Sequence, residues 1–175
     1  MNTETTKIHI SKKTVTFIVL AVFFVVLDRF LEALCLHGYF DHPVTIIGDI
    51  FTLSYVKNYY IAFSLPFSGP ILTALIGIII LTLLIYWLKL VFFTNLKVRT
   101  SNIGYALTIL IIGAILNFTD RIKFGFVIDY FYLKYFTIFN LADIMIVSGV
   151  IFLIVPNLKN YEHGENNNTI GKKGV

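Results

Sequence analysis

The apolar residues of this chain are concentrated in four long runs separated by shorter polar segments. The runs cover residues 14–36, 70–88, 103–118 and 138–155. At about 1.5 Å per residue of helix, the first run is long enough to cross a hydrocarbon core about 30 Å thick. The second and third runs contain no charged side chain, and the fourth contains one, Asp143. The pattern predicts an all-α membrane protein with four transmembrane helices.

The segment between the first two runs has a different pattern. Residues 49–60 partly alternate and are rich in β-branched and aromatic side chains, which favours short strands or a hairpin outside the membrane. We therefore expect a small β-element between spans one and two. Pro156 is expected to end the fourth span, which gives one domain over residues 1–156 and a polar cytoplasmic tail over residues 157–175.

The composition supports a membrane protein. Hydrophobic residues make up 57% of the chain and charged residues 14%, whereas soluble domains average about 45–50% and about a quarter. The net charge of +4 arises from cations beside the apolar runs, so it reports membrane topology and gives no reason to expect a nucleic-acid partner. Nine of the 14 Lys and Arg residues lie in the segments on the side of the two termini, and four lie in the opposite loops. This bias predicts that both termini are cytoplasmic.

On this topology, polar residues from three separate spans converge at the outer face of the membrane. Asp28, Asn117 and Asp143 all lie near the outer ends of their spans. Ionisable side chains at a membrane are costly, so a cluster of them is a functional-site hypothesis. Between Asn117 and Asp143 the chain also carries Asp120, Arg121, Asp129 and Asn140.

Two spacings within this stretch place polar side chains on one helix face. Asp120 and Arg121 follow Asn117 by three and four residues, which is the spacing of neighbouring side chains on one face of a helix. An ordinary ion pair at a helix end explains this first group equally well. Asn140 and Asp143 are also three residues apart, and Asp143 is predicted to lie five residues inside an apolar span. A residue that packs one helix on another is the alternative for Asp143.

Asp129 and Asp143 together suggest a reaction. Two carboxyl groups held close together share one proton, because both cannot ionise. One then activates a water as a general base, and the other donates a proton to the carbonyl oxygen or the leaving group. This is aspartic-protease chemistry without a metal. The alternative for Asp129 is a turn or N-cap residue.

Other reactive residues offer little. The only cysteine, Cys35, permits no internal disulfide, and the four histidines lack metal-ligand spacing, so we expect no metal and no cofactor. The basic start, the apolar run and Cys35 would also fit a lipoprotein signal peptide. Glu32 stands three residues before Cys35, where such a signal would have Leu, so we expect an uncleaved membrane anchor.

The polar motifs resemble those of the bacterial lipoprotein signal peptidase (signal peptidase II) family. N-F-T-D-R, V-I-D-Y and F-N-L-A-D follow one another between residues 117 and 143, and are similar to the family patterns N-x-x-D-R, V-V-D-F and F-N-x-A-D. N-Y-Y-I-A-F-S at 58–64 resembles N-x-G-A-A-F-S, and V-L-D-R-F-L-E at 26–32 resembles the first-span motif D-x-x-x-K. The resemblance covers residues 14–156.

The resemblance implies a function and a set of site residues. It implies cleavage of prolipoproteins just before the diacylglyceryl-modified cysteine, near the extracytoplasmic face of the bacterial cytoplasmic membrane. It also implies contact with membrane lipids, and we expect a monomer. The implied catalytic pair is Asp129 and Asp143. The implied substrate-binding residues are Asn58, Asn117, Arg121 and Asn140, and Asp28 and Asp120 are implied to be structural.

The chain departs from the family patterns at several small or charged positions, which makes it a divergent member. Tyr60 and Ile61 stand where the family has Gly-Ala, and are expected to narrow the substrate groove. Leu116 replaces a glycine and is expected to push helices apart. Glu32 replaces the first-span lysine. These departures motivate one alternative, a non-catalytic relative that binds lipoprotein precursors or another membrane partner. A transporter or proton relay is disfavoured, because its charges would lie near the bilayer midplane.

Overall fold

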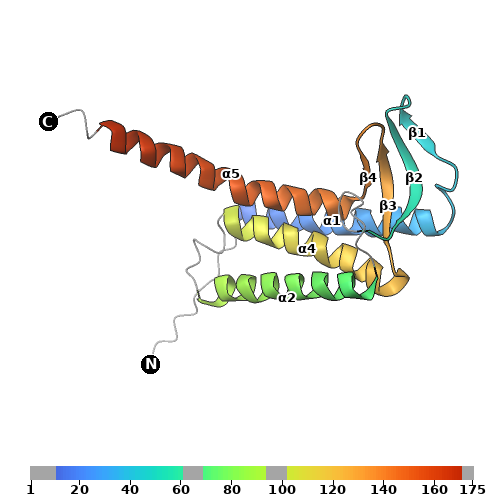
Figure 1. The fold of residues 1–175 in the computed structure, drawn as a ribbon, viewed down its shortest axis with the longest axis horizontal. Coiled ribbons are helices and arrows are strands. Elements are labelled where there is room, and N and C mark those ends of the chain that lie inside the picture. The colour runs from blue at the N-terminus through green and yellow to red at the C-terminus, as the bar shows by residue number, and fades with distance from the viewer. Residues whose placement is uncertain (1–10, 61–68, 94–101, 171–175) are drawn as a thin grey trace.

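The structure is a computed structural model that describes residues 11–60, 69–93 and 102–170, with side chains up to residue 155. The helices are α1 (Lys12–Leu36), α2 (Pro70–Phe93), α4 (Asn102–Phe124) and α5 (Leu141–Ile170). The strands are β1 (Val44–Ile47), β2 (Phe51–Asn58), β3 (Val127–Leu133) and β4 (Thr137–Phe139). Figure 1 shows the helices running roughly side by side, with all the strands gathered at one end and running across the helix axes.

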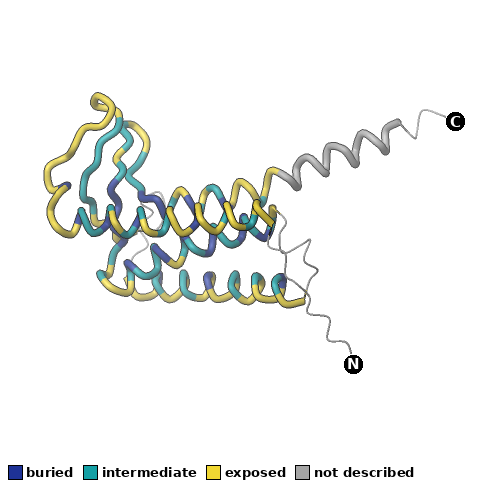
Figure 2. The backbone as a smooth tube through the Cα atoms, turned by 180° about the vertical axis from the view of Figure 1, so that it is seen from behind, coloured by how far each residue is buried: buried dark blue, intermediate teal, exposed yellow. Residues whose placement is uncertain are grey.

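The helices confirm the predicted membrane fold. By length and composition α1, α2 and α4 can each cross a membrane, and the segment Leu141–Val155 of α5 is a shorter apolar helix. Large apolar side chains such as Phe23 and Ile78 are exposed on α1 and α2. In a soluble protein this exposure would be unfavourable, but lipid is an apolar solvent for these faces. Figure 2 shows buried positions along the inner helices and where they meet the strands.

Two glycines allow α4 and α5 to pack closely. A Cβ atom added to Gly113 would lie 2.5 Å from the carbonyl oxygen of Ala142, and one added to Gly149 would lie 2.6 Å from the Cβ of Leu110. Small residues at such positions let helix backbones approach each other in a membrane. Leu116 is buried against α5 near Ala142, so the two helices stay in close contact despite this bulkier side chain.

The strands form one antiparallel sheet in the order β1-β2-β3-β4. The predicted β-element between spans one and two is confirmed as β1 and β2, but the sheet also includes two strands from the segment between α4 and α5. In the pairing of β2 with β3, Val56 lies opposite Asp129, and Asn58 lies opposite Val127. The sheet therefore joins two segments that are far apart in the sequence.

The helix bounds differ from the predicted spans at both ends of α5. The predicted start at residue 138 is wrong, because Thr137–Phe139 pairs with β3 and the helix begins at Leu141. Aromatic and β-branched residues suit a strand as well as a membrane helix, so hydropathy alone does not separate the two. Pro156 also does not end the helix, because α5 continues to Ile170, although its apolar segment is Leu141–Val155. A proline inside a helix removes one backbone hydrogen bond, and neighbouring turns can continue past it with a kink.

Candidate active site

Asp129 lies on β3 and is almost completely buried, with 1% of its surface exposed. Its Oδ2 accepts a hydrogen bond of 2.8 Å from the amide Nδ2 of Asn58, on the neighbouring strand β2. Its Oδ1 accepts one of 3.1 Å from the amide Nδ2 of Asn140. The strand pairing explains the first contact, because β2 is the strand beside β3 in the sheet.

Asp143 lies in the first turn of α5, so the prediction of a position five residues inside a span is corrected. Asn140 caps this helix: its Oδ1 accepts from the backbone N–H of Asp143 at 2.9 Å, and its own backbone N–H donates to Oδ2 of Asp143 at 3.2 Å. This reciprocal arrangement is a capping box. The N-terminus of a helix carries a partial positive charge that favours a carboxylate.

Asn140 and Asn117 connect the two aspartates. The Nδ2 of Asn140 contacts Oδ1 of Asp129 and also Oδ1 of Asn117, the latter at 3.0 Å. Asn117 in turn donates from Nδ2 to Oδ1 of Asp143 at 2.7 Å. A continuous chain of hydrogen bonds therefore runs from Asn58 through both aspartates. We name these five residues the dyad cluster: Asn58, Asn117, Asp129, Asn140 and Asp143.

The surroundings of Asp129 favour its protonated form. Burial is the largest cause that raises the pKa of Asp129, the negative charge of Asp143 adds to it, and together they bring the pKa to about 8. The hydrogen bond from Asn58 and the charge of Arg121 act in the opposite direction. Within the described residues, no ion pair joins Asp129 or Asp143 to a cation. At neutral pH the arrangement can therefore keep a proton on Asp129.

Arg121 lies close enough to act on Asp129 by its charge, but it donates hydrogen bonds elsewhere. Its guanidinium donates to the backbone carbonyl of Tyr60 at 2.5 Å and, more weakly, to that of Tyr59 at 3.5 Å. These contacts hold the chain where β2 ends, beside Asn58. Tyr60, where the chain departs from the family pattern, is therefore next to the site, whereas Ile61 lies outside the described residues.

The side chains of Asn117, Asp120 and Arg121, predicted to share one helix face, contact different partners in the structure. Asn117 joins the dyad cluster, whereas Asp120 accepts a bond of 2.7 Å from the guanidinium of Arg29 on α1. Arg29 also pairs with Asp28 at 2.7 Å and with Glu32. We name Arg29 and its three carboxylate partners, Asp28, Glu32 and Asp120, the Arg29 cluster.

Sequence reasoning missed two residues beside the candidate site. Arg29 is the first: a cation inside an apolar span needs a nearby anion, and its neighbours Asp28 and Glu32 are the sequence signal for that partner. Tyr130 is the second, because its hydroxyl donates to Oδ1 of Asp28 at 2.7 Å. Among the described residues, no group of three or more His, Cys, Asp or Glu is arranged to hold a metal ion.

Comparison with known proteins identifies the family of this chain. The sequence model of the family described as Signal peptidase (SPase) II matches residues 20–159. The lipoprotein signal peptidase of Caldicellulosiruptor bescii is 34% identical over 140 residues, which cover 80% of this chain and 87% of that protein. The lipoprotein signal peptidase of Bartonella henselae is 35% identical over 156 residues, which cover 85% and 92%.

A solved structure described as a bacterial membrane enzyme, determined by the in meso method at 2.3 Å resolution, has the same fold. It superposes with a TM-score of 0.70 at 27% identity, and the match covers 85% of this chain and 90% of that one. The family match, the relatives and the membrane fold agree. The chain is a multi-pass membrane protein of bacterial type and belongs to the signal peptidase II family of aspartic peptidases.

Proposed function

We propose that this protein cleaves the signal peptide from prolipoproteins, immediately before a cysteine that carries a diacylglyceryl group. The observation that carries the proposal is the dyad cluster, in which Asn140 contacts Asp129 and forms the capping box with Asp143. Amide groups hold both carboxyl groups, and within the described residues neither forms an ion pair. Two carboxyl groups brought close together in this way support a shared catalytic proton.

The two aspartates take different roles. Asp143 is the general base, because it lies in the first turn of α5, where the partial positive charge of the helix N-terminus favours a carboxylate. Asp129 is the general acid, because burial raises its pKa to about 8. Asp143 takes a proton from a water, the water oxygen bonds to the scissile carbonyl carbon, and Asp129 gives its proton to the carbonyl oxygen.

The tetrahedral intermediate then collapses, and each aspartate regains its starting protonation state. The leaving nitrogen takes the proton from Asp143 as the carbon–nitrogen bond breaks, and Asp129 recovers its proton from the hydroxyl as the new carboxyl group forms. Both aspartates return to their starting states, so no cofactor is consumed. Asn58, Asn117, Asn140 and Arg121 are the proposed substrate-binding residues, since they surround the two carboxyl groups or the end of β2 beside them.

The position of the site suits a lipid-anchored substrate. The dyad cluster lies at the end of the bundle where the sheet is attached. Most Lys and Arg residues lie in the segments on the side of the two termini, at the other end of the bundle, which supports cytoplasmic termini. We therefore assign the site to the extracytoplasmic face of the bacterial cytoplasmic membrane. There it meets the scissile bond while the acyl chains of the substrate stay in lipid.

A second candidate is a non-catalytic relative that binds lipoprotein precursors. Tyr60 favours it, because this large side chain replaces a small one beside Asn58, and Arg121 is bonded to its carbonyl. Binding without cleavage would then be the activity of the same groove.

A cleavage assay decides between the two. Purified protein in detergent is incubated with a diacylglyceryl-modified prolipoprotein, and the product is followed by gel shift. We expect the wild type to cleave, and Asp129→Asn and Asp143→Asn each to lose at least about 1,000-fold in rate. Asp49→Asn, at a carboxylate that is 90% exposed, is the matched control and should retain full activity. A wild type that binds the substrate without cleaving it would favour the second candidate.

A further inference from the structure

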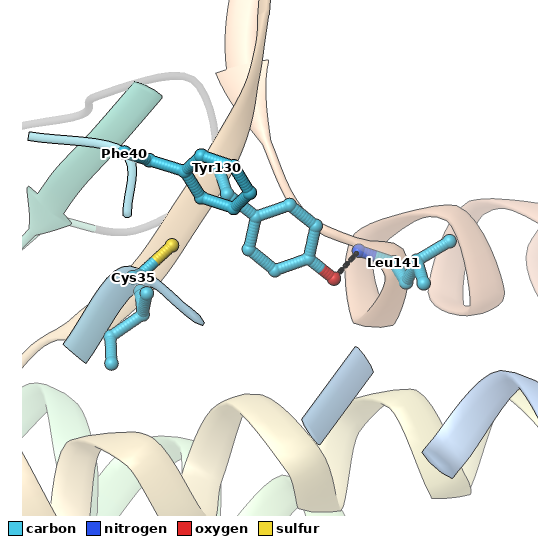
Figure 3. Close-up of a cluster of buried hydrophobic side chains, with 5 residues drawn as sticks. Cys35, Phe40, Tyr130 and Leu141 are labelled. Atoms are coloured by element: carbon cyan, nitrogen blue, oxygen red, sulfur yellow. Dashed lines mark hydrogen bonds between the residues drawn. The ribbon is translucent and has the colours of Figure 1, made fainter. Parts of the chain in front are cut away.

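Tyr130 follows Asp129 directly on β3 and points to the other side of the strand. Successive side chains of a strand face opposite sides, so the carboxyl group of Asp129 faces the dyad cluster and the ring of Tyr130 faces away from it. The ring is almost completely buried, with 1% exposed, in a cluster that includes Cys35, Phe40 and Leu141. Figure 3 shows the hydroxyl directed toward the backbone nitrogen of Leu141.

The hydroxyl of Tyr130 connects two helices. It donates to Oδ1 of Asp28 on α1 at 2.7 Å, and it accepts from the backbone N–H of Leu141 on α5 at 3.0 Å. Burial raises the pKa of Tyr130 well above its ordinary value, so the hydroxyl keeps its proton and remains a donor.

The α1 end of this connection is firmly anchored. Asp28 is buried, and its Oδ2 accepts two hydrogen bonds from Arg29, at 2.7 Å from Nη2 and 3.2 Å from Nε. Nη1 of Arg29 bonds Asp120 on α4 at 2.7 Å. The position of the Tyr130 hydroxyl is therefore set by two helices that do not carry the aspartates of the dyad cluster.

The α5 end of the connection lies inside the cap that carries Asp143. Leu141 is the first residue of α5, between Asn140 and Asp143, and its N–H is one of the donors that a helix leaves without an internal partner. Tyr130 satisfies this donor, whereas Asn140 satisfies that of Asp143. One side chain thus links the strand of Asp129 to the helix turn of Asp143.

We propose that Tyr130 is a positioning residue that fixes the separation and orientation of Asp129 and Asp143 through its bonds to Asp28 and Leu141. The proposal rests on the proposed function for its effect on catalysis. The family pattern V-V-D-F has Phe at this position, where this chain has V-I-D-Y. The hydroxyl is therefore an addition to a ring that the fold accommodates, and Tyr130→Phe removes this one group.

The alternative is that the Tyr130 hydroxyl has only a structural role, as the hydrogen-bond donor to the buried carboxylate of Asp28. Removal of the hydroxyl would then lower the melting temperature and leave the kinetics of the folded protein unchanged. A positioning role predicts an effect on the dyad itself, so the test compares kcat, KM and the pH profile. The matched control is Tyr132→Phe, which removes a hydroxyl from a ring that is 37% exposed on the same strand.

We expect Tyr130→Phe to lower kcat about tenfold with KM changed less than about twofold, because only the geometry of the reacting groups is lost. We also expect the alkaline limb of the pH profile to move to lower pH. A looser dyad admits water to Asp129, so burial and the charge of Asp143 raise its pKa less. The charges of Arg121 and Asp120 on α4 also act on Asp129 and remain in place.

An infrared titration tests the same proposal without turnover. The carbonyl stretch of protonated Asp129, assigned by its absence in Asp129→Asn, is followed against pH in the wild type, Tyr130→Phe and Tyr132→Phe. We expect a lower midpoint in Tyr130→Phe alone. If the wild type cleaves no prolipoprotein, the proposed function fails, and this midpoint still decides whether Tyr130 positions the pair.

Several outcomes would overturn the proposal. They are equal infrared midpoints in the wild type and Tyr130→Phe, an unchanged kcat in the folded variant, or a loss of activity that matches the unfolded fraction in a thermal melt. An equal effect of Tyr132→Phe would also overturn it, because that hydroxyl has no part in the connection between α1 and α5.

Discussion

The Arg29 cluster and the dyad cluster hold buried or half-buried carboxyl groups at the same end of the helix bundle, and they differ in their partners. In the Arg29 cluster, one guanidinium pairs with three carboxylates. In the dyad cluster, the amides of Asn58, Asn117 and Asn140 surround Asp129 and Asp143. In the Arg29 cluster an opposite charge counters the cost of burying each carboxylate. The carboxyl groups of the dyad cluster are instead held by hydrogen bonds from neutral amides and form no ion pair within the described residues.

The comparison explains how one short region can hold both structural and reactive aspartates. Burial of a carboxyl group penalises its charged form. Only the Arg29 cluster offsets this penalty with an opposite charge. The charge of Arg121 acts on Asp129, but its guanidinium donates hydrogen bonds to the backbone carbonyls of Tyr59 and Tyr60. Its charge influences the dyad without forming an ion pair.

The largest expected effect comes from removal of the central cation. Arg29→Met leaves three buried carboxylates without a counter-charge, and should destabilise the protein by roughly 3–5 kcal/mol. Thermal unfolding in detergent measures the loss. The matched variant Arg121→Met should cost less than about 1 kcal/mol, because its hydrogen bonds to backbone carbonyls are exposed and solvent can replace them. An equal loss of unfolding free energy in the two variants would contradict the proposed difference between the two clusters.

A smaller effect, on rate and not on folding, is expected at Asn117. Asn117→Ala removes the donor to Oδ1 of Asp143, and a hydrogen bond to a charged group contributes roughly 1.5–3 kcal/mol, so kcat should fall about 10- to 100-fold. The control is Thr119→Ala on the same helix, whose hydroxyl bonds only the carbonyl of Ile115. Steady-state cleavage kinetics measure both, and a normal kcat in Asn117→Ala would show that the amide does not support the base.

The pH profile sharpens the contrast further. Asp129 must hold a proton to act as the acid, and its pKa is raised to about 8, so kcat/KM should fall as the pH rises through about 8. The charge of Arg121 lowers this pKa, so Arg121→Gln should move the alkaline limb to higher pH. A movement to lower pH would mean that Asp129 is not the group that titrates.

The smallest effect is expected where a carboxylate is exposed. Asp49 lies 3.7 Å from the ammonium of Lys134 and is 90% exposed, so solvent screens the pair. Asp49→Asn should change stability by no more than about 0.5 kcal/mol in a thermal melt. A larger loss would mean that the tip of the sheet contributes more to folding than the two buried clusters suggest.

The sequence was sufficient to predict the four helices and the contact between Asn140 and Asp143, for physical reasons. The choice of Asn58 and the pairing of Asp129 with Asp143 rested on the resemblance to the family. Long runs without charge identify membrane helices, because each backbone polar group must be satisfied inside the segment. Asn140 and Asp143 are three residues apart on one helix, so their contact is local.

Long-range pairings were not predictable in the same way. Strands β3 and β4 lie in an apolar, aromatic segment, and hydropathy assigned part of it to span four. The partners of Arg29 and Tyr130 are on other elements, and no local spacing indicates them. Asp120 bonds Arg29 across 91 residues of sequence, and Tyr130 bonds Asp28 across 102. Such contacts follow from the packing of the helices and the register of the sheet.

The cap of α5 also bears on how the protein is made. On the proposed assignment, Asp143 belongs both to the cap of a helix and to the reacting pair. This helix follows α1, α2 and α4 in the sequence, so it is synthesised after them. A nascent chain that has produced β3 but not this turn carries Asp129 without its partner. On this assignment, proteolytic competence begins only when α5 has formed.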